Sequence, residues 1–292
     1  MNVLNILLYY LVIIPISSLP FPVLYKLSDG LYLLFYYVFG YRKKIVLQNI
    51  RNSFPDKSEK EHIEICKKFY KHFCDIVVES LKTFTISEKE MLKRVVCNNA
   101  EVINKYYDQK QSVIIAAGHY NNQELFAVII DRLIKHKVGG IYQPLTNKYF
   151  ENKMRSTRGK YGLTMVPTNK VKHFFEDNVN ELIAPAFAMD QSPSNPNKAY
   201  WMKFLNQETG VLYGTEKFAK EYNFPVIYCR MNKVKRGFYS LDFFDVTDKP
   251  RETEYGWITE TVMRLLEKDI QAIPQYWLWS HRRWKHKKPE GK

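Results

Sequence analysis

The residues with the clearest chemical potential lie in the segment GHYNNQEL, residues 118–125, where a glutamate follows a histidine by five places. A carboxylate that holds one imidazole nitrogen fixes the tautomer, and the other nitrogen can then accept a proton. With seven histidines and 30 acidic residues in the chain, roughly 0.7 such pairs are expected by chance. The spacing of His119 and Glu124 therefore needs support from its surroundings.

The sequence around this pair narrows the possible chemistry. No serine or cysteine lies close to His119, and there is no G-x-S-x-G motif to supply a protein nucleophile. There is no H-E-x-x-H motif and no second histidine at metal-ligand spacing, so we expect neither a metal nor a bound cofactor. The nucleophile that His119 would activate is then a hydroxyl group on the substrate.

The body of the chain alternates between short apolar runs and amphipathic stretches, which predicts an α/β fold with a largely parallel central sheet flanked by helices. A capping box at Ser58 and Glu61 opens a long helix over residues 58–83, whose expected apolar face is Ile63, Cys66, Phe69, Phe73, Val77 and Leu81. Strands are predicted at residues 113–117, 138–142, 182–188 and 225–229, with an antiparallel strand at 238–246. Helices are predicted at residues 123–135, 147–161, 211–222 and 255–272.

Three polar pairs follow predicted strands, at the sheet edge where ligands bind in such folds. They are Gly118-His119, Gln143-Pro144 and Asp190-Gln191. On one continuous helix, residues five apart point about 140° away from each other. The predicted arrangement therefore places His119 in a loop and Glu124 in the first turn of the next helix, with Asn122 as the N-cap.

The N-terminal residues 3–39 are almost entirely apolar, with one acid (Asp29) and one base (Lys26). The segment is nearly long enough to cross a bilayer, but Pro15 and Pro20 would bend or end a helix. We expect a membrane anchor or a kinked hairpin in residues 1–45, although a buried helix pair of a soluble domain is the alternative. The basic cluster YRKK at residues 41–44 marks the cytoplasmic side, which predicts a cytoplasmic domain over residues 46–292.

The chain is basic and rich in aromatic residues, with a formal net charge of +14 and 15% Phe, Trp and Tyr. Beside an apolar N-terminus, this charge favours an anionic membrane as the partner, and no sequence pattern of a nucleic-acid-binding module accompanies it. The tail HRRWKHKKPEGK, with Trp277, Trp279 and Trp284 interleaved, is predicted to contact lipid headgroups. The four cysteines lack metal spacing and are expected to be reduced, partly buried thiols.

Several motifs in order resemble those of the bacterial lipid A biosynthesis acyltransferases, over nearly the whole chain. They are YRKKIVLQNIRNSFPD, GHYNNQE, IYQPLTNKYFENKMRSTRGKYG, FAMDQSP and PQYWLWSHRRWK. The resemblance implies a layered glycerolipid-acyltransferase-like domain. It also implies that a fatty acyl chain moves from acyl carrier protein to a hydroxyl of a lipid A precursor, at the inner membrane of a Gram-negative bacterium.

Carried over to this sequence, the resemblance makes His119 the general base and Glu124 the residue that orients it. Arg158 would pair with a sugar phosphate or steady Asp190; a plain ion pair on a charged helix is the structural alternative. For Asp190, the alternative is a turn residue before Ser192. The predicted substrate-binding residues are Arg158, Asp190, Gln191, Gln143 and Asn122.

The chain departs from the family pattern at Gln143, where arginine is common, and at Tyr120, Asn121 and Gln123 inside the histidine motif. These departures leave open how the acyl chain or the sugar is held. A Phe-Pro-Glu-Gly motif typical of glycerol-phosphate acyltransferases is absent, which favours a glycolipid acceptor. The alternatives are acylation of another glycolipid or aminolipid, or a catalytically dead membrane-bound binding protein of the same fold.

Overall fold

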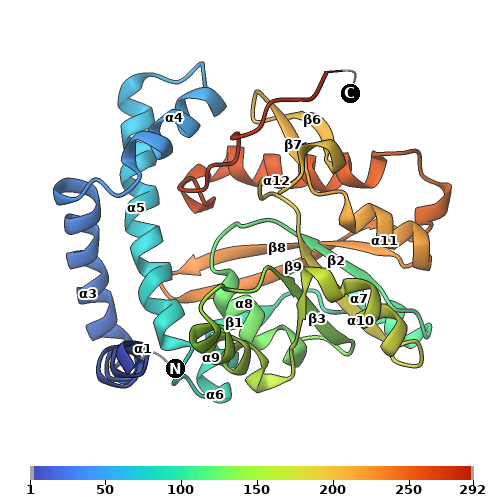
Figure 1. Cartoon of the computed structure of the whole chain (residues 1–292), viewed down its shortest axis with the longest axis horizontal. Helices are drawn as coiled ribbons and strands as arrows, with labels where there is room; N and C mark the ends of the chain where they lie inside the picture. The colour runs from blue at the N-terminus through green and yellow to red at the C-terminus, as the bar shows by residue number, and fades with distance from the viewer. Residues whose placement is uncertain (1–2, 291–292) are drawn as a thin grey trace.

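A seven-stranded sheet forms the centre of the protein in the computed structural model, which describes residues 3–290 (Figure 1). The strand order is β1-β9-β8-β2-β5-β3-β4, and β6 and β7 form a separate antiparallel hairpin. The strands of the large sheet are β1 (Val95–Cys97), β2 (Ile114–Ala117), β3 (Lys137–Tyr142), β4 (Thr164–Pro167), β5 (Ile183–Ala188), β8 (Val226–Lys235) and β9 (Phe238–Thr247). The hairpin consists of β6 (Tyr200–Phe204) and β7 (Gln207–Val211). Only the β8–β9 pair is antiparallel within the large sheet, so the predicted largely parallel architecture is confirmed.

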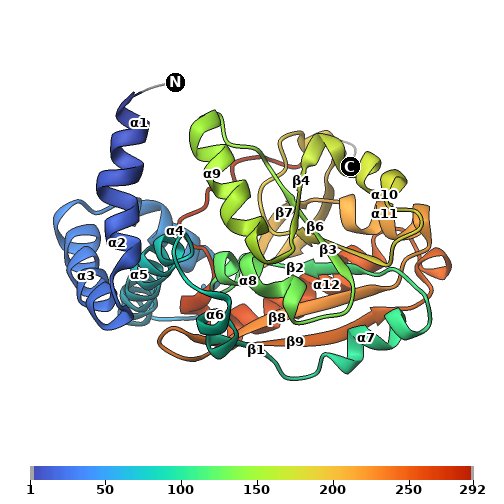
Figure 2. The same ribbon diagram turned by 90° about the horizontal axis from the view of Figure 1, so that it is seen from below.

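Helices cover both faces of this sheet, because side chains alternate between faces along each strand. In β2, Ile114 and Ala116 pack on one face and Ile115 packs on the other. The first face is covered by α10 (Val171–Asp177), α11 (Gly214–Tyr222) and α12 (Trp257–Ala272). The second is covered by α6 (Glu88–Arg94), α7 (Glu101–Asp108) and α8 (Gln123–Ile129), and α9 (Lys148–Arg158) packs on α8 (Figure 2).

Helix α5 (Glu59–Lys82) stands at one side of the sheet, with the N-terminal helices packed along it (Figure 1). These are α2 (Ile14–Ser18), α3 (Phe21–Leu33) and α4 (Lys43–Ser53). Helix α1 (Val3–Leu8) precedes α2 and has no buried residue, and π-helical turns lie at Tyr9–Ile13 and Leu34–Val38. The capping box predicted at the start of α5 is present, since Ser58 and Glu61 exchange both hydrogen bonds.

The buried face of α5 differs from the predicted apolar face. Cys66 and Phe69 are buried as expected, whereas Phe73 and Val77 are only half-buried. The most deeply buried positions of the second half of the helix include Asp75 and Glu79, at 5% and 0% exposure. Because α3 covers one side of α5 and the end of the β8–β9 hairpin approaches another, apolar periodicity alone misplaced this face.

Most of the predicted elements are confirmed with small shifts of their ends. Strand β8 extends beyond its predicted end at residue 229 to Lys235. It pairs with β9, which corresponds to the antiparallel strand predicted at residues 238–246. The helix predicted over residues 211–222 begins later, at Gly214, because Val211 ends β7. Sequence reasoning missed β1, β4 and the β6–β7 hairpin, which are short or carry no alternation of apolar and polar residues. All four cysteines are free, and Cys66, Cys74 and Cys229 are buried.

The N-terminal segment is bent rather than straight. Within residues 3–290 no single helix is long and apolar enough to cross a bilayer, although the pair Val3–Ser18 and Phe21–Val38, bent by 115°, meets the length and composition together. Helix α3 packs along α5, and the guanidinium group of Arg236 binds Asp29 from the tip of the β8–β9 hairpin. The helix therefore shares contacts with the body, and the predicted domain boundary at residues 45 and 46 stays a prediction.

The C-terminal tryptophans do not form the predicted headgroup-binding surface. Trp277 and Trp279 are 3% and 0% exposed and pack edge-to-face against each other in the core. Trp284 is half-buried and donates its indole N–H to the Thr209 hydroxyl. Burial of these large indole rings contributes to the core, which the helices α4 and α12 and the β6–β7 hairpin help to build.

Leu24 tests whether α3 belongs to the folded body. Its side chain is 0% exposed, so we expect Leu24→Ala to lower the free energy of unfolding by about 2–5 kcal/mol. Leu27 on the same helix is 41% exposed, and Leu27→Ala should change it by less than about 0.5 kcal/mol. Denaturant unfolding of the full chain in detergent measures both. Equal, small effects would mean that α3 does not stabilise the fold.

Candidate active site

The segment between β2 and α8 forms a loop of defined shape. Gly118 follows the last residue of β2, and a Cβ atom there would lie 2.4 Å from the end of the Leu266 side chain of α12, so a larger residue would require that leucine to move. Asn121 adopts a left-handed conformation with a φ of 64°. Asn122 then caps α8, because its side-chain oxygen accepts the N–H of Leu125 at 3.1 Å. The predicted loop, N-cap and helix start are confirmed.

His119 is held by Asp190, which follows β5. The imidazole Nδ1 donates to Asp190 Oδ1 at 2.7 Å, and the backbone N–H of His119 donates to Asp190 Oδ2 at 2.9 Å. The indole N–H of Trp277 also donates to Asp190 Oδ2, at 2.7 Å. Strands β2 and β5 are neighbours in the parallel sheet, so their carboxyl ends bring these two residues together as the sequence predicts.

The electrostatics of Asp190 favour its ionised form. Burial raises the pKa of this carboxyl, but the charge of His119 and the hydrogen bonds from His119 and Trp277 outweigh burial and bring the pKa to about 2. An ionised Asp190 keeps the proton of His119 on Nδ1, because that nitrogen must donate to it. In the neutral imidazole the other nitrogen, Nε2, then carries a lone pair, and the side-chain amide of Gln191 lies 2.8 Å from it.

Glu124 does not orient His119, contrary to the prediction. It lies in the first turn of α8 and forms a two-pronged ion pair with Arg158 of α9, at 2.9 Å from Nε and 2.5 Å from Nη2. Arg158 therefore steadies Glu124 rather than Asp190. The left-handed residue Asn121 and the cap at Asn122 turn the chain between the two predicted partners, while Asp190 approaches His119 from the adjacent strand.

The remaining predicted substrate-binding residues occupy different environments. The side-chain amide of Gln191 lies at Nε2 of His119, as described. Gln143 is exposed after β3 and accepts a hydrogen bond from the Thr168 hydroxyl at 2.9 Å. Asn122 is 0% exposed, with its oxygen on the α8 cap and its amide on Glu79. We therefore assign Asn122 to holding the loop rather than to contacting substrate.

The C-terminal segment builds the back of the site, a role that sequence reasoning did not assign. The carbonyl of His119 accepts the N–H of Leu278, and the N–H of Asn121 donates to the carbonyl of Tyr276. Tyr120 pairs with Trp277 as an isolated β-bridge. The signal that could have revealed this role is the indole N–H of a buried tryptophan, which needs an acceptor.

Two of the unusual residues in the histidine motif are structural. Tyr120 is 6% exposed and donates its hydroxyl to backbone carbonyls at the end of α12, and Asn121 is 4% exposed and donates its amide to the Met231 carbonyl. Gln123 instead lines a small, partly open pocket beside the loop. The pocket is lined mainly by the apolar parts of Tyr120, Gln123, Phe126, Tyr228, Arg230 and Met231.

A histidine held by a buried carboxylate, with a side-chain amide on its second nitrogen at the carboxyl edge of a parallel sheet, is an arrangement that can serve as a general base for a nucleophile supplied by the substrate. Within residues 3–290, no group of three or more His, Cys, Asp or Glu side chains is arranged to hold a metal ion. The side-chain partners of His119 in this part of the chain are Asp190 and Gln191.

Comparisons with known proteins identify the class to which this site belongs. Residues 2–286 match the model of the bacterial lipid A biosynthesis acyltransferases, and the chain belongs to that family. It is also similar to the lipid A biosynthesis lauroyltransferase of Escherichia coli (strain K12), with 23% identity over 282 residues. The matched region covers 94% of this chain and 89% of that protein. The protein is an acyltransferase of lipid A biosynthesis.

The His119–Asp190 contact predicts the effect of Asp190→Asn on acyl transfer. The asparagine amide would donate to Nδ1 and force the proton onto Nε2, where it blocks base catalysis. We expect kcat to fall by about 10³- to 10⁴-fold with the fold intact. Trp277→Phe removes only the indole N–H and should lower kcat by about 10- to 100-fold. Steady-state kinetics of the purified variants measure both, and a wild-type kcat in Asp190→Asn would refute the tautomer assignment.

Proposed function

We propose that this protein transfers a fatty acyl chain from acyl carrier protein to a hydroxyl group of a lipid A precursor, with His119 as the general base. The observation that carries the proposal is the pair of contacts on His119, with Asp190 on Nδ1 at 2.7 Å and the Gln191 amide on Nε2 at 2.8 Å. Membership of the lipid A acyltransferase family supports the acceptor class.

The reaction follows from this arrangement. The acceptor hydroxyl replaces the Gln191 amide at Nε2 and gives its proton to His119, while its oxygen attacks the carbonyl carbon of the acyl thioester. Asp190 stabilises the imidazolium that forms, as a buried carboxylate does in an acyl-transfer triad. The C–S bond then breaks, and the thiolate leaves with the proton from His119. Backbone amides near Gly118 are candidates for stabilising the negative charge on the carbonyl oxygen.

Glu124 and Arg158 have a supporting role in this proposal. Their side chains are 25% and 21% exposed, so the pair lies partly in solvent. The carboxylate of Glu124 fixes the plane of the Arg158 guanidinium group. The remaining N–H groups of Arg158 are then left for an anionic group such as a sugar phosphate. Gln143, which is exposed after β3, is a further candidate for contact with the glycolipid headgroup.

Acyl carrier protein as the donor is supported by charge. The chain carries a formal net charge of +14, and an acidic carrier protein would be steered toward it. The donor is testable with the same acyl chain attached either to acyl carrier protein or to coenzyme A. A strong preference for coenzyme A, at matched salt concentration, would contradict this part of the proposal.

His119→Ala tests the proposed base. Loss of a general base should lower kcat by about 10²- to 10⁴-fold in transfer from acyl carrier protein to a lipid A precursor. His173→Ala is the matched control, because His173 is an exposed histidine on α10 and should retain full activity. In cells lacking the gene, mass spectrometry of lipid A should show one acyl chain fewer, restored by the wild type but not by His119→Ala. Unchanged lipid A would point to another amphiphile as acceptor.

The location that we propose is the cytoplasmic face of the inner membrane, with the bent N-terminal pair inserted into one leaflet. Of the 24 large apolar side chains exposed among residues 3–290, 15 belong to residues 3–41. Such a concentration on one segment is typical of a surface that contacts lipid or another protein. Basic residues at 41–44 follow it, where they would meet anionic headgroups.

Leu11→Asp tests the membrane contact. Leu11 is 69% exposed, and placing a charge there should lower partition of the protein onto anionic phospholipid vesicles at least about tenfold, because apolar burial is lost and a charge is added. Val179→Asp is the matched control, since Val179 is 78% exposed outside the N-terminal segment. Sedimentation with vesicles measures both. An equal effect of the two substitutions would refute the assigned membrane surface.

A further inference from the structure

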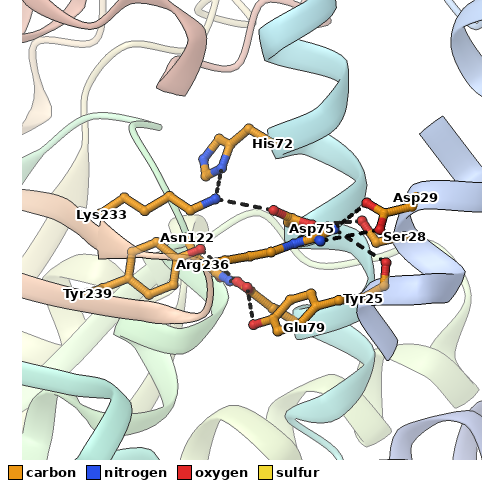
Figure 3. A network of polar contacts seen from close by, with 10 residues as sticks. All are labelled: Tyr25, Ser28, Asp29, His72, Asp75, Glu79, Asn122, Lys233, Arg236 and Tyr239. Atoms are coloured by element: carbon orange, nitrogen blue, oxygen red, sulfur yellow. Dashed lines mark hydrogen bonds and ion pairs between the residues drawn. The ribbon is translucent and has the colours of Figure 1, made fainter. Parts of the chain in front are cut away.

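A buried polar network lies between α3, α5 and the β8–β9 hairpin (Figure 3). It reaches the loop of residues 118–122 between β2 and α8, which we call the catalytic loop. Its centre consists of Asp75 and Glu79, one turn apart on α5 and 5% and 0% exposed. The other members are Tyr25, Ser28 and Asp29 from α3, His72 from α5, Asn122 from the catalytic loop, and Lys233, Arg236 and Tyr239 from the hairpin. A charged or polar face buried at this depth is stable only when its atoms are hydrogen-bonded.

The Asp75 half of the network clamps three elements together. Arg236 donates to Asp75 and to Asp29, and the hydroxyl of Ser28 donates to Asp75 at 2.8 Å. The ammonium group of Lys233 lies 3.2 Å from Asp75 Oδ2. These contacts hold the hairpin tip and α3 against α5 without involving the active site.

The Glu79 half leads to the active site. Its Oε1 accepts the hydroxyl of Tyr25 at 2.9 Å, and its Oε2 accepts both the hydroxyl of Tyr239 at 2.7 Å and the amide of Asn122 at 2.6 Å. The side-chain oxygen of the same Asn122 caps α8 through Leu125. One asparagine side chain therefore joins a buried carboxyl group to the first turn of the helix that carries Glu124.

We propose that Glu79 is a positioning residue for the acyl-transfer site: through Asn122, its carboxyl group fixes the point at which the catalytic loop becomes α8. Asn122 lies three residues after His119 and two before Glu124. A shift of this cap moves both His119 relative to Asp190 and Glu124 relative to Arg158. The inference rests on the proposed function, in which His119 is the base.

The raised pKa of Glu79 is consistent with this role. Burial raises the pKa of Glu79, while hydrogen bonds from Tyr239 and Asn122, the charge of Lys233 and the hydrogen bond from Tyr25 act in the opposite direction. In the protonated acid, Oε2 still accepts from Asn122 and Tyr239, and the O–H on Oε1 donates to the Tyr25 oxygen. A glutamine reproduces this pattern, with its carbonyl at Oε2 and its amide N–H at Oε1.

Four variants of the full chain separate positioning from general packing. Glu79→Leu removes every acceptor at similar volume, and we expect kcat to fall by about 30-fold or more with the KM for the acceptor changed less than threefold. Glu79→Gln should retain kcat within threefold. Asn122→Asp faces Glu79 with a second carboxyl group and should be impaired as strongly as Glu79→Leu. Glu79→Gln combined with Asn122→Asp restores a donor–acceptor pair and should recover activity to within fivefold of the wild type.

Tyr239→Phe is the matched control. It removes a hydrogen bond to the same Oε2 atom, and in the described part of the chain the Tyr239 side chain makes no hydrogen bond to the catalytic loop. It should lower the melting temperature but leave kcat within threefold. A kcat loss in Tyr239→Phe equal to that in Glu79→Leu, at equal loss of stability, would show that Glu79 acts only through packing and would overturn the proposal.

A readout without substrate keeps the inference separate from the proposed function. The full chain is labelled with ¹⁵N-histidine, and the His119 ring signals are assigned with His119→Ala. These signals should shift in Asn122→Asp. They should lie at their wild-type positions in Glu79→Gln combined with Asn122→Asp, and also in Tyr239→Phe. Should the wild type transfer no acyl chain from acyl carrier protein to a lipid A precursor, the proposed function fails, and these spectra still decide the role of Glu79. Unchanged His119 signals in a folded Asn122→Asp protein overturn the positioning role.

Discussion

The contact between His119 and Asp190 is the interaction on which the rest of the site depends. It exists because β2 and β5 are neighbouring parallel strands whose carboxyl ends lie side by side. The close approach of α12 at Gly118 and the pairing of the loop with Trp277 leave the histidine little freedom to leave that position. Preorganised contacts of this kind lower the reorganisation that an acyl transfer would otherwise require.

The architecture was largely predictable from the sequence. The buried strands at residues 114–117 and 183–188 are short and apolar, and the convergence of their ends predicted that His119 lies near Asp190. The identity of the orienting acid was not predictable from spacing. Five residues separate His119 from Glu124, whereas 71 separate it from Asp190, and only the strand order shows that the distant residue is the neighbour.

Helix α5 shows why the other details escaped prediction. Its apolar residues alternate at helical spacing, but the helix is enclosed on more than one side, so polar residues such as Asp75 and Glu79 are as buried as Cys66. Periodicity reports one apolar face and carries no information on a buried polar face, whose partners come from elements far away in sequence. The same holds for Trp277, whose acceptor lies 87 residues earlier.

The pairing of residues 276–278 with the catalytic loop also has a consequence for the order in which the enzyme becomes active. Ribosomes deliver the chain from its N-terminus, so β2, β5 and the helices around them emerge well before the segment that supplies Trp277 and the backbone partners of His119. Asn49 of α4 then binds the carbonyls of Trp279 and His281, which ties this late segment to the element that follows the apolar N-terminus. The loop that holds His119 therefore reaches its final contacts only after residues 276–281 have been synthesised and have packed against α4.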